Sequence, residues 1–259
     1  MNKNILISII VSVLFITSCI SSKGIDFKKK PPANNNKIDT SVLDHSNWDL
    51  LLKKYVDDQG FVDYKGFVKD KQKLYAYTDY LSEHSPEDSW SYNEQLAYFI
   101  NVYNANTIKL VVENYPVKSI KDISATFSPF LKNFIKIDDK TFSLADIEKG
   151  FLQKMNEPKI HFAINCASYS CPKLMRDAYT AENVEKLMNT AVQTFINSKK
   201  NKITPNKATL SKIFKWYKKD FLNTSESIID YINQYSDVKI EANAIIDYKE
   251  YNWSLNDTK

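Results

Sequence analysis

The chain has 259 residues, of which 43% are hydrophobic and 25% charged, and this composition excludes collagen-like, coiled-coil and wholly disordered proteins. Its 4 glycines are isolated and it has only 3 histidines, so we find no glycine-rich phosphate loop and expect no cofactor and no metal. The net charge of +4 is carried by residues 1–40 while residues 41–259 are formally neutral, which argues against a nucleic-acid partner.

The first eighteen residues have the pattern of a secretory signal peptide. Lys3 precedes an apolar run from Ile5 to Ile16, which is too short to span a bilayer. The run ends in Ile16-Thr17-Ser18-Cys19, which resembles the bacterial lipoprotein lipobox. An ordinary signal peptide followed by a chance cysteine is the alternative.

Residues 19–40 are predicted to form a lipidated, flexible tether. They are rich in Ser, Lys, Asn and Pro and offer little apolar surface to bury. Acyl chains on Cys19 would hold the protein on a membrane without a transmembrane helix. We therefore expect an extracytoplasmic protein of the bacterial cell envelope whose partner is a membrane.

Residues 41–259 are predicted to be one mainly helical α+β domain around a small sheet. We find no internal repeat and no Gly/Pro-rich break in this range. Extended segments are expected at 160–165, at 245–253 and in a hairpin that joins 203–204 to 209–210. Apolar residues at helical spacing predict helices at 42–56, 69–81, 93–114, 144–155, 181–197, 211–222 and 227–234.

The helix at 93–114 carries the first group of candidate functional residues. Glu94 and Asn101 share a face, and Asn104 lies about 60° from Asn101 at 100° per residue. These side chains are predicted to face inward, where a polar group needs a hydrogen-bond partner, so they mark a site or a structural network. Ser91 and Glu94 also fit a capping box, which would give Glu94 a structural role.

The segment from Ile160 to Leu174 is the strongest candidate for chemistry. It places His161, Cys166 and Cys171 together, at the expected end of a short apolar strand. A thiolate nucleophile needs a lowered pKa and usually a base nearby, and His161 is the nearest candidate. Residues five apart point to opposite faces of an ideal strand, so His161 and Cys166 meet only if the strand ends or bulges before the cysteine.

Three other interpretations of this segment remain open. Cys166 and Cys171 could form a disulfide in an oxidising compartment. Both could be buried, unreactive thiols. His161 could be a hydrogen-bonded histidine of the core. Spacing alone does not decide which cysteine would react.

Two further features are candidate ligand contacts. Arg176 is the only arginine among 35 basic residues, which hints at a need for a planar donor toward a carboxylate, although chance placement is the simpler explanation. Aromatic residues cluster at 214–221, including Trp216, and at 248–253. Such clusters form core more often than they line a ligand groove.

The sequence resembles the domain-of-unknown-function 547 family of bacterial exported proteins and plant proteins. The resemblance runs in order through most of residues 45–256. It is carried by the segments at 94–104, 115–120, 143–148, 161–172, 213–217 and 251–256.

This resemblance favours Cys166 as the functional thiol, because in plant members the position matching Cys171 is commonly Ser. It implies that a disulfide is not the shared feature of the family. His161 and the helix with Glu94, Asn101 and Asn104 match the family pattern too. A thiol, an imidazole and a buried acid or amide resemble the arrangement in papain-like cysteine hydrolases, which is an analogy of fold and logic only.

We therefore expect a cysteine-dependent hydrolase or acyl transferase acting on an unknown small molecule or peptide. Cys166 would attack a carbonyl, His161 would carry the proton, and Glu94 or Asn101 would orient the imidazole. Backbone N–H groups of residues 167–170 would stabilise the oxyanion. The expected substrate contacts are Asn101, Asn104, Ser168, Arg176 and Trp216.

Two non-hydrolytic alternatives stay open. One is an exported, non-catalytic scaffold or binding domain with a Cys166–Cys171 disulfide. The other is a redox protein that cycles the same pair of cysteines. The sequence makes no prediction of oligomeric state.

Overall fold

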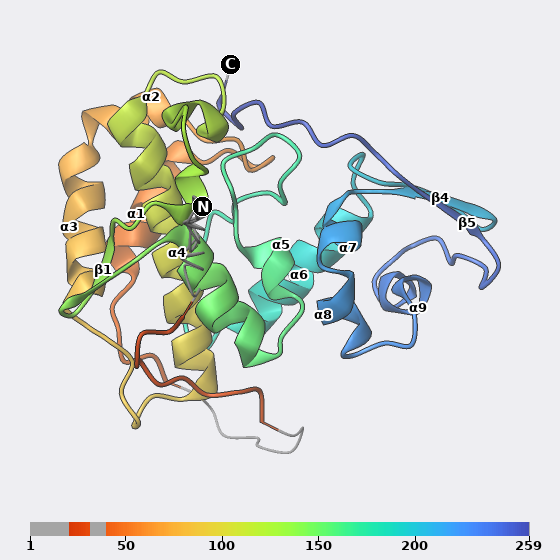
Figure 1. The fold of residues 1–259 in the computed structure, drawn as a ribbon, viewed down its shortest axis with the longest axis horizontal. Coiled ribbons are helices and arrows are strands. Elements are labelled where there is room, and N and C mark those ends of the chain that lie inside the picture. Colours follow the sequence, from red (N-terminus) through yellow and green to blue (C-terminus); the bar gives the residue numbers. More distant parts are fainter. Residues whose placement is uncertain (1–20, 32–39, 259) are drawn as a thin grey trace, which may run out of the picture.

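The computed structural model describes residues 21–31 and 40–258. Cys19 and the predicted signal peptide lie outside these residues. Figure 1 shows two groups of elements: helices α1–α4 lie on one side, and α5–α9 with a small sheet lie on the other. The elements of the first group and of the segment that follows it are α1 (Ser46–Tyr55), α2 (Tyr64–Lys69), α3 (Lys71–Ser82), α4 (Tyr92–Asn114), η1 (Ile120–Ile123), η2 (Pro129–Leu131), β1 (Ile135–Ile137), β2 (Lys140–Phe142), η3 (Asp146–Phe151) and η4 (Leu152–Met155).

The second group carries the only three-stranded sheet of the described residues. Antiparallel β3 and β4 form the predicted hairpin, and β5 joins β4 in parallel. The elements are α5 (Ile160–Ala163), α6 (Val184–Ile196), β3 (Lys202–Thr204), β4 (Lys207–Leu210), α7 (Ile213–Trp216), α8 (Lys218–Leu222), α9 (Ile228–Asn233) and β5 (Ile245–Tyr248).

Helix α4 is the centre of the molecule. The Ser91 side chain caps it by accepting a hydrogen bond from Glu94 N–H (3.0 Å), and it ends at Asn114, one residue before the Tyr115-Pro116 bond. Most of its residues are buried, polar ones such as Asn101 and Asn104 included, and α4 contacts α2, α3, α6, η3 and η4.

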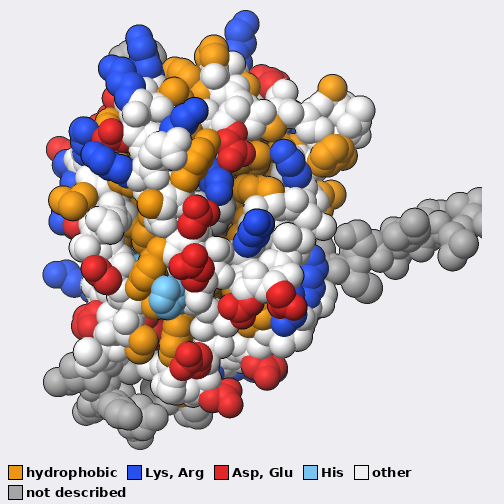
Figure 2. Space-filling view, turned by 90° about the vertical axis from the view of Figure 1, so that its left-hand side faces the viewer, with side chains coloured by type: hydrophobic (Ala, Val, Ile, Leu, Met, Phe, Trp, Pro, Cys, Tyr) orange, Lys and Arg blue, Asp and Glu red, His pale blue; other side chains and the backbone are white. Residues whose placement is uncertain are grey.

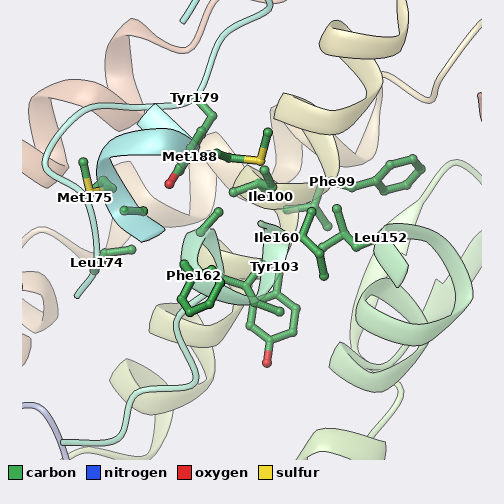
Figure 3. Close-up of a cluster of buried hydrophobic side chains, with 14 of the residues drawn as sticks. Phe99, Ile100, Tyr103, Leu152, Ile160, Phe162, Leu174, Met175, Tyr179 and Met188 are labelled. Atoms are coloured by element: carbon green, nitrogen blue, oxygen red, sulfur yellow. The ribbon is translucent and has the colours of Figure 1, made fainter. Parts of the chain in front are cut away.

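One continuous core joins the two groups of elements. Figure 3 shows side chains of α4, η4, α5 and α6 packed together with those of the segment before α6. The buried cluster extends from Ile25 to Ile240. The structure thus confirms an α+β class with a single core. Figure 2 views the face that carries α3, where acidic and basic side chains alternate with small apolar groups.

Several elements differ from their predicted form. Residues 160–163 form helix α5 instead of a strand, because a short apolar run suits either state and burial against α6 decides between them. Residues 146–155 form a π-helical turn, η3, followed by the 3₁₀ turn η4. The predicted helix at 211–222 is broken at Tyr217 into α7 and α8. The hairpin of β1 and β2, and helix α2, were not predicted.

Residues 21–31 belong to the predicted tether and lie against the body of the protein. Ile25 is buried, and the Phe27 ring packs on Phe151 at 5.7 Å between centroids. Lys28 N–H donates to Gln95 Oε1 (2.7 Å), and Lys30 forms an ion pair with buried Glu157. The other residues of the predicted tether, 32–39, lie outside the described residues.

Candidate functional site

The backbone that leads into Cys166 is fixed by α4. Asn104 Nδ2 donates to Ala163 O (3.0 Å), and Asn165 N–H donates to Asn104 Oδ1 (2.8 Å). One amide side chain thus satisfies a donor and an acceptor at the end of α5. Asn104 therefore positions the cysteine through the backbone and was correctly predicted to face inward.

The loop after Cys166 is tightly folded on itself. Ala167 has a φ of 59°, a left-handed conformation that is strained for a residue with a Cβ. Asn165 holds this conformation, because its Oδ1 accepts from Ala167 N–H (2.9 Å) while its Nδ2 donates to Pro172 O (2.7 Å). This left-handed conformation turns the chain sharply next to the Cys166 sulfur.

The C-terminal segment crosses this loop and holds it in place. Tyr169 N–H donates to Ser254 O (2.7 Å), and Asn256 N–H donates to Ala167 O (3.2 Å). We call residues 249–258 the strap. It passes from the sheet toward α2, as the dark blue trace in Figure 1 shows. Only residues 245–248 of the predicted extended segment pair as a strand. Lys249 N–H still donates to Leu210 O at the end of β4, and the rest of the strap bonds to loops.

Cys166 Sγ lies among three hydrogen-bonding groups. It is 2.8 Å from Cys171 Sγ, 3.1 Å from Ser168 Oγ and 3.3 Å from the Tyr251 hydroxyl. These hydrogen bonds, first that from Cys171, outweigh the effect of burial and lower the pKa of the Cys166 thiol to about 7. A large fraction of Cys166 is therefore thiolate at neutral pH.

Cys171 has the opposite character. It is buried, its pKa is raised by desolvation and by the neighbouring Cys166, and its sulfur accepts a hydrogen bond from Cys166 N–H (3.0 Å). Both cysteines are free thiols in the structure. The pair therefore consists of an outer thiol whose pKa is lowered to about 7 and an inner thiol whose pKa is raised.

Cys166 opens onto a cleft of about 410 Å³ with aromatic walls. Trp216 is 48% exposed there, and its ring packs against Tyr251 at 4.8 Å between centroids. Tyr251 in turn packs on Trp253 at 4.6 Å. Trp216, an expected substrate contact, lines the cleft together with both strap residues, whereas Phe214 and Phe221 of the same aromatic cluster are buried in the core.

His161 lines the same cleft but does not contact Cys166. Its Nε2 lies 2.8 Å from Asp220 Oδ2, and its ring stacks on Tyr217 at 3.8 Å between centroids. His161 is only 3% exposed, and its Nδ1 has no hydrogen-bond partner among the described residues. The expected direct Cys166–His161 hydrogen bond is absent from the described contacts, because α5 and not a strand sets the direction of the ring.

Asp220, and not Glu94 or Asn101, holds the imidazole. Glu94 Oε1 accepts from Leu43 N–H (3.0 Å), and burial raises the pKa of this carboxyl group. Asn101 brackets Tyr179, donating to its carbonyl (2.7 Å) and accepting from its N–H (3.2 Å). Neither Glu94 nor Asn101 lines the cleft. The capping box is half formed, since Ser91 caps α4 while the Glu94 carboxylate turns to Leu43.

The remaining predicted site residues fall in different places. Ser168, an expected substrate contact, has its Oγ 3.1 Å from the Cys166 sulfur. Arg176 lies outside the cleft, where it pairs with the Asp58 carboxylate and donates to Lys53 O (3.0 Å). Of the loop N–H groups predicted to form an oxyanion hole, those of Ala167, Tyr169 and Ser170 are already bonded within the protein.

Sequence reasoning missed Tyr251 and Asp220 as site residues. Asp220 lay inside a segment noted for its aromatic content, and Tyr251 lay inside segments noted for aromatic content and for the family resemblance. Asp220 could have been noticed in the sequence as the single acidic residue among the aromatic residues of 214–221. Nothing local marks Tyr251, because its role depends on the path of the strap.

Two kinds of feature are absent from the described residues. No helix among them has the length and apolar composition needed to cross a bilayer. No group of three or more His, Cys, Asp or Glu side chains in the described part of the chain is arranged to hold a metal ion.

Fold and site together define an α+β domain with a pair of free cysteines at an aromatic cleft. Residues 87–196 match the family described as "Protein of unknown function, DUF547", in agreement with the resemblance found in the sequence. The matched range includes α4, His161 and both cysteines; Asp220 and the strap lie beyond it. No curated protein and no solved structure matches the chain, and the papain-like analogy has no support.

Proposed function

We propose that the protein is a cysteine-dependent hydrolase or acyl transferase with Cys166 as its nucleophile. The observation that carries the proposal is the Cys166 sulfur, which is held by three hydrogen-bonding groups, has a pKa of about 7 and opens onto a cleft of about 410 Å³. A thiolate preformed in this way needs no base in contact with it.

In the proposed reaction the Cys166 thiolate attacks an ester or amide carbonyl, forming a C–S bond. The tetrahedral intermediate collapses to a thioester when the bond to the leaving group breaks, and the leaving group takes the Nδ1 proton of the His161 imidazolium. The ring takes up this proton from solvent before the first turnover and from the second nucleophile in each later turnover. A water or an acceptor alcohol or amine then gives a proton to His161 and attacks the thioester. The C–S bond breaks, and the thiolate is restored.

Asp220 supports the proton-transfer role that we assign to His161. With Nε2–H donated to the Asp220 carboxylate (2.8 Å), the lone pair of Nδ1 is the free acceptor of the ring. The carboxylate also stabilises the imidazolium that forms when Nδ1 takes a proton. Asp220 acts through His161 and is a positioning residue.

Tyr251 is the proposed oxyanion donor. Its hydroxyl lines the cleft 3.3 Å from Cys166 Sγ, and burial raises the pKa of this phenol, so it stays a neutral donor. Since most loop N–H groups are bonded elsewhere, a side-chain donor takes the place of the predicted backbone hole. The aromatic walls favour an apolar or aromatic group beside the reacting carbonyl.

The test is to trap the acyl-enzyme. The full chain is incubated with p-nitrophenyl phenylacetate, quenched in acid and analysed by peptide mass spectrometry. We expect a thioester on Cys166 of the wild type and of Cys171→Ala, and none at this position in Cys166→Ala. Phenolate release that is equal in wild type and Cys166→Ala would contradict the proposal.

The short distance between the sulfurs favours a second candidate, dithiol–disulfide exchange. Here the Cys166 thiolate attacks a substrate disulfide, and one substrate thiolate leaves. Cys171 loses its proton and attacks the mixed disulfide; the second substrate thiolate leaves and a Cys166–Cys171 bond remains. The sulfur–sulfur distance of 2.8 Å fits this step. Equilibration with glutathione buffers tests it: the pair should interconvert within the range of the buffer. A pair that stays fully bonded in all of them indicates a structural disulfide and the scaffold alternative.

We also propose that the chain is an exported bacterial lipoprotein of the cell envelope, anchored through Cys19. The support is the sequence of residues 1–19. Mass spectrometry of the mature N-terminal peptide should find residues 1–18 removed and Cys19 acylated. An unmodified Cys19 in the mature protein would contradict this assignment.

A further inference from the structure

A second and larger groove lies on the other side of the cysteine loop. It has a volume of about 660 Å³ and lies between the loop at 169–173, the C-terminal part of α6 and the start of the strap. Tyr251 borders both this groove and the cysteine cleft. The proposed reaction does not use the groove.

The charge in this groove is strongly unbalanced. Five lysines and a single carboxylate, that of Glu250, line it. We call it the lysine groove, formed around Lys173, Lys199, Lys200, Lys212 and Lys249. This excess is local, because residues 41–259 are formally neutral as a whole.

Four of the five lysines of the groove have no carboxylate within ion-pair distance among the described residues. Among the described residues, only Lys212 has a carboxylate within ion-pair distance, namely Glu250 at 2.7 Å. The Glu250 side chain is 93% exposed, so it does little to neutralise the interior of the groove. Each of the other four lysines repels its neighbours without a nearby acid to offset the repulsion.

Lys200 is the most constrained of the five. It is half-buried, and its ammonium group donates to Tyr169 O (2.7 Å) and to Cys171 O, which are neutral acceptors. Burial without a carboxylate lowers its pKa. Lys249 similarly donates to a carbonyl, that of Lys199 (2.6 Å). The ammonium groups of Lys200 and Lys249 therefore lie in one concave surface, are bound to carbonyl groups, and each keep at least one N–H free to donate.

We propose that the lysine groove binds a multiply charged oxyanion of the phosphate or pyrophosphate type. Several lysines around one hollow suit a ligand with more than one negative charge, because each added charge relieves their mutual repulsion. Lysine binds phosphate as a point charge, whereas the planar carboxylate recognition typical of arginine is not available here. The Ser211 hydroxyl, which accepts from Ile213 N–H and donates to no other described group, supplies a further donor in the lining.

The test measures inorganic pyrophosphate binding to the full chain by titration calorimetry. The double variant Lys199→Met/Lys249→Met removes two charges and leaves Lys200, which holds the cysteine loop, unchanged. Lys65→Met, at an exposed position of α2, is the matched control. We expect saturable binding that weakens with added salt, at least a tenfold loss in the double variant and no change in the control.

A second arm separates the two sources of such a phosphate. Co-sedimentation with phosphatidic acid vesicles, whose phosphomonoester headgroup can carry two charges, is compared between wild type and the double variant and detects binding of a lipid headgroup. Pyrophosphate binding alone identifies a soluble phosphorylated ligand, and a groove-dependent gain on vesicles identifies a membrane phosphate. The inference is overturned if neither probe distinguishes the double variant from wild type, with thermal melting showing that both are folded.

Discussion

The hydroxyl of Tyr251 lies 3.3 Å from Cys166 Sγ, although the two residues are 85 positions apart in the chain. The same hydroxyl accepts a hydrogen bond from Ser168 Oγ (2.9 Å). The strap therefore does two things at once: it clamps the backbone of the cysteine loop, and it supplies a side chain that touches the sulfur. The site is complete only when the end of the chain has docked.

Tyr251→Phe should raise the pKa of Cys166 while leaving the packing against Trp216 and Trp253 intact. One lost hydrogen bond of about 1 kcal/mol corresponds to a rise of roughly half to one pH unit. The rate of iodoacetamide alkylation as a function of pH measures this shift. Tyr248→Phe, on β5 and outside the cysteine cleft, is the control. An unchanged pH profile in Tyr251→Phe would exclude the phenol as a partner of the sulfur.

Asp220→Asn should slow acyl transfer without changing alkylation of Cys166. The neutral amide no longer stabilises the His161 imidazolium, so we expect a loss of roughly 10²-fold in acyl transfer. Asp220→Glu, which keeps the charge, should recover part of the activity. A merely structural role predicts instead that alkylation and acyl transfer fall together and that both carboxylate and amide variants behave alike.

Asn101→Leu should destabilise the fold strongly. The Asn101 side chain pairs with both the N–H and the C=O of Tyr179, and both groups are left buried and unpaired in the variant. A cost of roughly 2 to 5 kcal/mol in the free energy of unfolding follows from two such losses. Asn106→Leu is the control, because Asn106 donates only to Val102 O within its own helix. Equal destabilisation of the two variants, measured by urea unfolding, would contradict this account.

His45 should make stability fall below neutral pH. It is buried against Tyr77, and burial lowers its pKa to about 4 from an ordinary value of 6.5. Below pH 6.5 the unfolded chain binds a proton that the folded chain does not, so stability is lost as the pH falls from 6.5 through 4.

Between pH 7.5 and pH 5 this linkage amounts to about 2 kcal/mol of unfolding free energy. Urea unfolding at the two pH values should show a smaller loss for His45→Gln than for wild type or the control His84→Gln. A loss of the same size in all three proteins would rule out His45 as the source.

The parts of the fold and of the site that could be predicted are those that depend on residues close together in the sequence. The helix around Asn101 and Asn104 was expected to face inward, because polar residues shared a face with apolar ones, and it does. The hairpin of β3 and β4 was expected from its turn residues and is present. Cys166 and Ser168 were identified as neighbours in one loop.

The remaining parts depend on tertiary contacts. The prediction of a strand at residues 160–163 was wrong, because a four-residue apolar run fits both a helix and a strand. Its packing partner α6 begins about twenty residues later in the sequence. The predicted partner of His161 was wrong for the same reason. Asp220 contacts the imidazole from α8, which is separated from α7 by the break at Tyr217. Local periodicity contains no information on either contact.

The most direct test of the account is the rate at which Cys166 is alkylated as a function of pH, compared with Cys171 by peptide mass spectrometry. Because the hydrogen bond from Cys171 is the largest cause of the low pKa, Cys171→Ala should raise the midpoint and Cys171→Ser should raise it less. We predict a midpoint near pH 7 for Cys166 and little labelling of Cys171. A Cys166 midpoint at the value of an ordinary thiol, unmoved by Cys171→Ala, would contradict the account.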